Sequence, residues 1–216
     1  MPTAPSKKKT ATPQTRDAEA TRARILDAAE EEFAKNGLGA ARTEAIAAQT
    51  GVTKAMIYYY FDSKERLYEA VLERAFAERI KTIQKISVEK LGPSEMLERF
   101  IGEFISGAAL NPNWPSILMF EAMQNKGKYY NKIGITSVYG MLAAVLERGM
   151  ETGDFRRLDP LHAAVNIIGM CSFYFCAHEN LKHLWPGRKM MSEEMIEEHR
   201  REAIRMIMAA VRKPSA

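Results

Sequence analysis

Apolar residues recur with a helical period along almost the whole chain. Ile25, Ala28, Ala29 and Phe33 share one face of a helix, and Gly37 follows them as a residue that can end it in a left-handed conformation. No segment alternates between apolar and polar residues over a useful length, so strands are not expected. The pattern predicts an all-α protein with about nine helices.

Caps and breakers divide this pattern into individual helices. Two short helices are expected at 43–50 and at about 54–60, with Thr43 and Thr53 as their N-caps. A long helix begins at Asp62 or Ser63 and runs to about Leu91. The remaining helices are expected at about 94–110, 115–124, 128–151, 160–182 and 193–212.

Residues 43–60 combine two short helices with a tight turn. Ala47 leaves room for the second helix to cross the first, and Gly51 allows the positive φ that the turn requires. Ile46 and Ile57 face a common core. This arrangement is typical of a helix-turn-helix, whose second helix enters the major groove of DNA.

The exposed side of the second helix carries residues that suit a DNA surface. Thr53 and Lys54 lie at its N-terminus, where backbone N–H groups and the helix dipole favour phosphate. Ala55 is small enough for a close approach to the bases and can contact a thymine methyl group. The three tyrosines at 58–60 cannot all be buried on so short a helix. We therefore expect one ring to pack inward and the others to remain available to DNA.

The segment 43–67 also resembles a known family. It is similar to the N-terminal domain of the TetR/AcrR family through Thr43, Ile46, Ala47, Gly51, Val52, Thr53, Lys54, Ile57, Tyr58, Tyr60, Phe61, Ser63, Lys64, Glu65 and Leu67. Two positions depart from the pattern, because many relatives have histidine in place of Tyr60 and glycine in place of Ala55. These departures leave the operator sequence open.

The resemblance implies a three-helix DNA-binding head at 17–62 and a larger helical body at 63–216 that binds an effector and dimerises. Thr43 and Lys64 resemble the phosphate contacts of the family, and Tyr58 resembles its backbone-contacting tyrosine. The other candidates occupy base-reading or groove-facing positions. The candidate DNA-binding residues are Thr43, Thr53, Lys54, Ala55, Tyr58, Tyr59 and Lys64.

Positive charge is concentrated at the N-terminus. Residues 1–16 are rich in Pro, Thr, Ala and Lys, so we expect a disordered basic arm there. Four of the 31 basic residues and no acidic residue lie in this arm, which leaves 27 of each sign for the rest of the chain. The arm is either a solvated tail or a segment that contacts phosphate or the minor groove. The net charge of +4 is therefore weak support for DNA binding by the folded part.

Other classes of protein find little support in the sequence. No run of eighteen apolar residues and no N-terminal apolar segment is present, which argues against a membrane span or a secretory signal. Two cysteines do not make a disulfide framework, so a cytoplasmic, nucleoid-associated protein is expected. The sequence has no nucleophile–base pair, phosphate-binding loop, paired carboxylates or metal-ligand spacing, so we expect no enzyme, no cofactor and no metal.

Aromatic and methionine side chains are frequent in the body, as a small-molecule cavity requires. Each of them also fits ordinary core, and it is the family resemblance that implies a pocket between the helices at about 94–182. Effector pockets have a few polar anchors, for which Asn166, His178 and Glu121 are candidates, although His178 also fits a satisfied helix-end histidine. The candidate ligand-binding residues are Phe100, Phe104, Trp114, Phe120, Met123, Tyr139, Tyr174 and His178.

The helix at about 160–182 is apolar over most of its circumference and therefore needs cover on both sides. Together with the helix at 193–212 it predicts a homodimer interface, and the resemblance implies the same. Two heads related by a two-fold axis would bind half-sites about one DNA turn apart, in a near-palindromic operator.

The sequence thus predicts a DNA-binding transcription regulator, in the form of a repressor that a small apolar or amphipathic ligand releases from its operator. The ligand would shift the helix at 115–124, which would pull on the long helix that begins at Ser63. The alternative is an effector-independent structural or cell-division factor that shares the head but has no cavity in the body.

Overall fold

The computed structural model describes residues 13–87 and 91–214 of the 216-residue chain. Over this part the chain forms nine α-helices and one short 3-10 helix, and its one strand-like contact is an antiparallel bridge between Phe155 and Arg212. The all-α prediction is therefore confirmed. The helices are α1 (Pro13–Ala40), α2 (Thr43–Thr50), α3 (Lys54–Phe61), α4 (Lys64–Ser87), α5 (Pro93–Leu110), α6 (Asn113–Gln124), η1 (Tyr130–Lys132), α7 (Ile135–Thr152), α8 (Pro160–Leu181) and α9 (Glu193–Val211).

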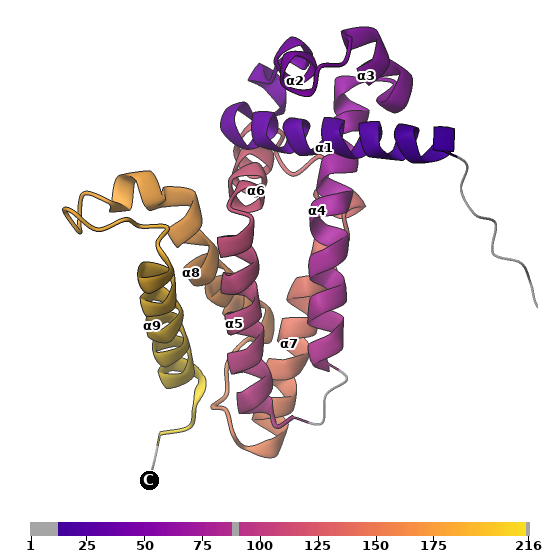
Figure 1. Cartoon of the computed structure of the whole chain (residues 1–216). Coiled ribbons are helices and arrows are strands. Elements are labelled where there is room, and N and C mark those ends of the chain that lie inside the picture. The colour runs from indigo at the N-terminus through magenta and orange to yellow at the C-terminus, as the bar shows by residue number, and fades with distance from the viewer. Residues whose placement is uncertain (1–12, 88–90, 215–216) are drawn as a thin grey trace, which may run out of the picture.

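Helices α1, α2 and α3 form a head at one end of the molecule (Figure 1). Ile46 of α2 and Ile57 of α3 are buried together with the apolar face of α1, as their spacing predicts. Gly37 has a φ of 67° and interrupts α1, while Gly51 ends α2 with a φ of 73°. Both glycines thus adopt a left-handed conformation that other residues rarely adopt.

Several helix boundaries differ from the prediction at the head end of the chain. Helix α1 begins at Pro13, so the last four residues of the expected arm are helical, and residues 1–12 lie outside the described part. Thr43 is the first residue of α2, whose N-cap is Arg42, so its prediction as the N-cap is wrong. Its side chain is instead buried against Tyr58, with 3.4 Å between the two hydroxyl oxygens.

One further boundary differs in the body. Helix α4 opens at a Ser63 cap, whose Oγ accepts the Arg66 N–H at 3.1 Å, and it is helical up to Ser87, whereas residues 88–90, just before its predicted end near Leu91, lie outside the described part. The helix expected at 128–151 begins only at Ile135, because Gly134 has a φ of 66° and separates it from the short turn η1.

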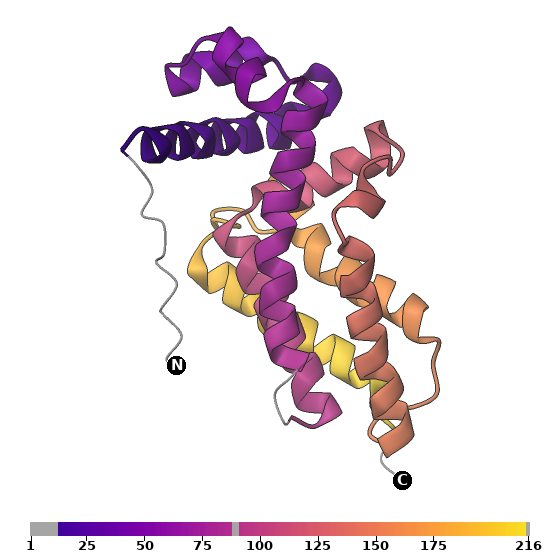
Figure 2. The ribbon, with the colours of Figure 1, turned by 90° about the vertical axis from the view of Figure 1, so that its right-hand side faces the viewer.

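Helix α4 leaves the head and runs down the body beside α5 and α7, as two views at right angles show (Figures 1 and 2). Helix α8 packs against α5, α6 and α7, and α9 packs against α5 and α8. A single cluster of buried residues continues from Ile25 in the head to Val211 near the end of α9. Head and body therefore share one hydrophobic core.

The head rests on the body where α1 packs against α4 and α6. The ring of Phe33 in α1 meets the edge of Tyr68 in α4 at 5.0 Å. The Tyr68 hydroxyl donates to Glu121 Oε2 at 3.1 Å, and this α6 carboxylate also accepts Asn125 Nδ2 at 2.6 Å and the Tyr129 N–H at 2.7 Å. Burial and the Glu121 carboxylate raise the pKa of Tyr68 above its ordinary value. Glu121 is thus fully buried, with its carboxylate hydrogen-bonded within the protein.

Candidate nucleic-acid interface and ligand cavity

One face of α3 is turned to solvent along its whole length. Thr53 caps this helix by accepting the Met56 N–H at 3.2 Å, and Lys54 and Ala55 follow it on the exposed side. The ring of Tyr59 is 82% exposed, whereas Tyr60 packs against the core. The tyrosines therefore divide between the two faces of the helix, as the short helix length predicts.

A hollow of about 460 Å³ lies where the starts of α2 and α4 meet the end of α3. We call it the α2–α4 hollow; it is lined by residues 41–44, Tyr58 and residues 62–65. It brings together Thr43, Tyr58 and Lys64, which come from three different helices. Lys64 Nζ donates to the carbonyl oxygens of Ala41 at 3.1 Å and Gly39 at 3.3 Å, so in this state it is held at the end of α1.

Sequence reasoning missed the acidic partner of Lys54. The Lys54 amine forms an ion pair with Glu44 of α2. Their hydrogen bond lowers the pKa of Glu44 and raises the pKa of Lys54. Both side chains are largely exposed, so the pair is weak and can exchange for another partner. Arg42, exposed at the edge of the α2–α4 hollow, is a second basic residue that the motif did not single out.

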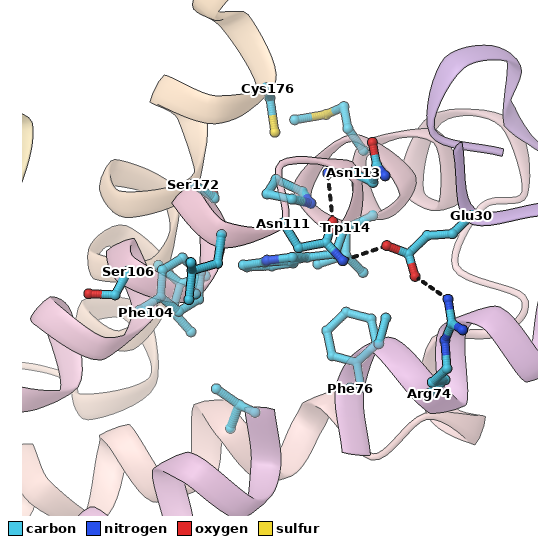
Figure 3. Close-up of a pocket in the computed structure, with 18 of the residues that line it drawn as sticks. Glu30, Arg74, Phe76, Phe104, Ser106, Asn111, Asn113, Trp114, Ser172 and Cys176 are labelled. Atoms are coloured by element: carbon cyan, nitrogen blue, oxygen red, sulfur yellow. Dashed lines mark hydrogen bonds and ion pairs between the residues drawn. The ribbon is translucent and has the colours of Figure 1, made fainter. Parts of the chain in front are cut away.

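A larger cavity of about 860 Å³ lies in the body directly beneath the head (Figure 3). Its walls come from α1, α4, α5, α6, α7 and α8, together with Tyr130 of η1. Aromatic rings form much of the lining: Trp114 meets Phe104 edge-on at 5.1 Å and Phe76 edge-on at 6.1 Å. Burial and a hydrogen bond with Tyr139 raise the pKa of Tyr130 above its ordinary value.

The end of the cavity nearest the head is polar. Arg74 of α4 donates to Glu30 Oε2 at 2.9 Å and to Asp27 Oδ1 at 2.6 Å, and both acids belong to α1. Asn111, at the end of α5, donates to the other oxygen of Glu30. Figure 3 shows this chain of contacts beside the rings of Trp114 and Phe76. Helix α1 of the head therefore supplies part of the cavity wall.

Comparison with known proteins identifies the family. The model described as "Bacterial regulatory proteins, tetR family" matches residues 25–71, and the model described as "Tetracyclin repressor-like, C-terminal domain" matches residues 93–207, more than half of the chain. The chain belongs to the TetR family of regulators. The resemblance inferred from residues 43–67 is confirmed, and this TetR-family protein is a DNA-binding transcription regulator.

Individual relatives of this TetR-family protein agree with the family models. The HTH-type transcriptional repressor NicS of Pseudomonas putida is 30% identical over 162 residues, which cover 73% of this chain and 76% of NicS. The HTH-type transcriptional repressor SCO4008 of Streptomyces coelicolor is 36% identical over 109 residues, about half of each chain (50% and 53%).

Solved structures share the fold of this TetR-family protein. The ketosteroid regulator KstR2 of Mycobacterium tuberculosis has a TM-score of 0.70 at 20% identity, over 89% of this chain and 95% of KstR2. FadR of Bacillus subtilis, solved with stearoyl-CoA, has a TM-score of 0.70 at 21% identity, over 87% of this chain and 98% of FadR.

Only some of the residues predicted to bind a ligand line the cavity. Phe104, Trp114 and Tyr139 line it. Phe100 lies behind Phe104, with the two rings stacked at 6.2 Å, and is buried in the core. Phe120 is half-buried on α6 outside the lining.

The remaining three predicted ligand residues lie elsewhere. Met123 is 73% exposed on α6, outside the cavity lining. Tyr174 is buried against His199, with the ring centroids 4.3 Å apart, and its hydroxyl donates to the Met190 carbonyl. His178 Nδ1 lies 2.8 Å from the Phe175 carbonyl oxygen, which fits the alternative of a satisfied histidine near a helix end. These placements do not match a role in binding a ligand in this cavity.

The charged lining residues Glu30 and Arg74 were not foreseen, because they come from α1 and α4, outside the helices at about 94–182 where the pocket was expected. Asn166, the other predicted anchor, is exposed on α8. Cys176 lines the cavity and Cys171 is buried, and both are free thiols. Burial raises the pKa of both, which favours the unreactive thiol form.

Proposed function

We propose that this protein is a transcription repressor that binds a near-palindromic operator as a homodimer and is released by a small apolar or amphipathic ligand. The observation that carries this proposal is the cavity of about 860 Å³, whose wall includes the DNA-binding head itself. Its volume is in the range of small-molecule sites, and its lining is largely apolar with a few polar groups. An effector-independent structural factor would need no such cavity.

In the proposed complex α3 lies in the major groove. Thr53, Lys54, Ala55 and Tyr59 are exposed on the face that would meet the base edges. A DNA phosphate would bind in the α2–α4 hollow, where the hydroxyls of Thr43 and Tyr58 and the amine of Lys64 can donate to it. Phosphate contacts position the head, and base contacts choose the sequence.

The dimer is proposed to form through α8 and α9. Large apolar side chains are exposed on both helices, including Leu161, Val165 and Phe173 on α8 and Met206 on α9. Phe173 alone is 57% exposed, which is costly for a side chain of this size unless a partner covers it. Within the described residues α8 is also the one helix long and apolar enough to cross a membrane by length and composition. A partner subunit on its exposed face explains the same apolarity in a cytoplasmic, nucleoid-associated regulator.

Ligand binding would act where the cavity meets α1, α4 and α6. Helix α1 packs against α4 and α6, Tyr68 of α4 contacts Phe33 of α1, and the Tyr68–Glu121 hydrogen bond joins α4 to α6. A shift of either helix would therefore change the position of the head. A change of a few ångströms in the distance between two heads breaks their match to adjacent major grooves, about 34–36 Å apart. The coupling expected between ligand and operator is about 1–3 kcal/mol. The stearoyl-CoA bound to FadR shows that a protein of this fold can hold a ligand, but it does not identify the ligand here.

The first test is selection of binding sites from random DNA duplexes with the purified full chain at a stated salt concentration. Recovery of one near-palindromic motif, bound with two subunits per duplex, is expected. Binding that is non-specific and depends steeply on salt would contradict the proposal and leave only a general DNA-binding role.

A further inference from the structure

The charged residues that line the cavity are mostly acidic. Four carboxylates, Asp27, Glu30, Glu31 and Glu103, line the cavity together with one guanidinium, that of Arg74. Asp27 and Glu31 are exposed at its edge, and Glu103 pairs with Arg99, which is not part of the lining. Arg74 already pairs with Asp27 and Glu30 through two different nitrogens. Among the described lining residues, no other basic side chain is present to neutralise an acidic ligand. The wall therefore disfavours a carboxylate or a phosphate in the cavity.

Glu30 is the carboxylate best placed to act on a ligand. It is only 6% exposed, so its charge is weakly screened by water. Its two oxygens accept one hydrogen bond each, from Arg74 and from Asn111. A carboxylate can accept about four hydrogen bonds in all, so it has the capacity to bind a further donor.

Aromatic rings stand next to this carboxylate. In Figure 3 the rings of Trp114 and Phe76 lie beside Glu30, and all three residues line the cavity. Trp114 meets both Phe76 and Phe104 edge-to-face, and the three rings line the cavity. The electron-rich face of an aromatic ring attracts a cation within about 6 Å, and tryptophan does so most strongly. An acidic residue and aromatic faces together suit a positively charged, apolar molecule.

We propose that the cavity selects cationic amphipathic ligands, with an aromatic or alicyclic body and an ammonium or similar cation, and that Glu30 determines this selectivity. This inference rests on the proposed function, because it assumes that the cavity is the effector site. It also gives the ligand a direct route to the head. A cation that binds Glu30 competes with Arg74 and Asn111 for the carboxylate that joins α1 to α4 and α5.

The test uses two ions of nearly equal shape and opposite charge, tetraphenylphosphonium and tetraphenylborate. Calorimetric titration of the full dimeric protein at ~0.15 M salt is expected to give at least about tenfold tighter binding of the cation. The chain carries a net charge of +4, so non-specific attraction would favour the anion instead. Equal binding, preference for the anion, or no binding of either ion would overturn the proposal.

The variant Glu30→Gln keeps the size of the side chain and removes its charge. We expect the ratio of cation to anion affinity to fall by about tenfold. Glu73→Gln is the matched control, because Glu73 is exposed on α4 next to Arg74 and does not line the cavity. Its ratio of cation to anion affinity should stay within about twofold of the ratio for the unmodified protein. A general loss of folding would weaken the binding of both ions, whereas loss of the Glu30 charge should weaken only the binding of the cation. An unchanged ratio in a Glu30→Gln variant that binds the anion as tightly as the unmodified protein refutes the role of Glu30.

A second readout links the cavity to the head. Tetraphenylphosphonium should weaken operator binding, and by linkage operator DNA should weaken tetraphenylphosphonium binding by the same factor. If the anion alone produced this effect, the ligand class would be wrong while the repressor function stood. If site selection recovered no operator, the proposed function would fail whichever ion bound.

Discussion

Replacing Lys64 by alanine separates two roles of its amine. In the free protein Lys64 Nζ donates to Ala41 O and Gly39 O, and so ties the start of α4 to the end of α1. The same amine lines the α2–α4 hollow with Thr43 and Tyr58, where we propose that a DNA phosphate binds. The variant tests whether one side chain both stabilises the head and neutralises phosphate.

The two effects have different magnitudes and different signatures. Each neutralised phosphate adds about 0.9 to the slope of log affinity against log salt, so one lysine per subunit contributes about 1.8 in a dimer. Between ~50 and ~200 mM salt, the unmodified protein should therefore lose about tenfold more affinity than the Lys64→Ala variant. Losing hydrogen bonds from a partly exposed amine should lower the free energy of unfolding by about 1 kcal/mol. That corresponds to a fall in Tm of about 2–4 °C for a chain of this length.

Fluorescence anisotropy of a labelled operator duplex, titrated at several salt concentrations, measures the slope, and circular dichroism follows unfolding. Lys189→Ala is the control, since this exposed lysine of the α8–α9 connection carries the same charge away from the head. It should leave both quantities unchanged. If Lys64→Ala lowered Tm but kept the original slope, Lys64 would only hold α1, and the assignment of a phosphate contact would be wrong.

Three further predictions follow from single contacts. Glu44→Gln removes the ion-pair partner of Lys54 and one negative charge from the DNA-facing side. Operator affinity should therefore rise severalfold in the anisotropy assay. An unchanged affinity would mean that Lys54 does not reach DNA. Phe173→Glu should convert the dimer to a monomer in size-exclusion chromatography with light scattering, and a dimer that persists would exclude the α8 interface. Tyr68→Phe removes a donor to the buried Glu121 carboxylate and should lower the free energy of unfolding by about 1.5–3 kcal/mol in urea denaturation. A loss below about 0.5 kcal/mol would show that Glu121 finds another donor.

The head could be predicted from the sequence because its determinants are local. Gly51, Thr53 and the pair Ile46 and Ile57 lie within a few helical turns of one another, and each has the conformation or burial that its residue type favours. The prediction of Thr43 as an N-cap failed because a tertiary contact decides the position of this residue. A threonine at a helix start fits the N-cap and the first helical position equally well, and only the contact with Tyr58, fifteen residues away, distinguishes them.

The cavity could be predicted only in part. Helical spacing shows that a residue lies on an apolar face, but it does not show whether that face meets the core, a cavity or solvent. Trp114 and Met123 lie on the same helix, yet Trp114 lines the cavity and Met123 is exposed. The polar end was missed altogether, since Glu30 and Arg74 are 44 residues apart and no local motif joins them.

Helix α1 therefore belongs to the head and also lines the cavity. Sequence reasoning placed it in the head and expected a ligand signal to travel from 115–124 through the long helix that follows the head. The contacts of Tyr68 are compatible with that route, since this residue hydrogen-bonds to Glu121 of α6 and contacts Phe33 of α1. Glu30 offers a shorter route from the ligand to the head, because this residue lines the cavity and is itself part of α1. A ligand that disturbs the Glu30 contacts with Arg74 and Asn111 would act on the head without first moving α6. The two routes differ in one consequence. Tyr68→Phe should weaken only the coupling between ligand and operator that runs through α6 and α4, and Glu30→Gln should weaken only the coupling that runs directly through α1.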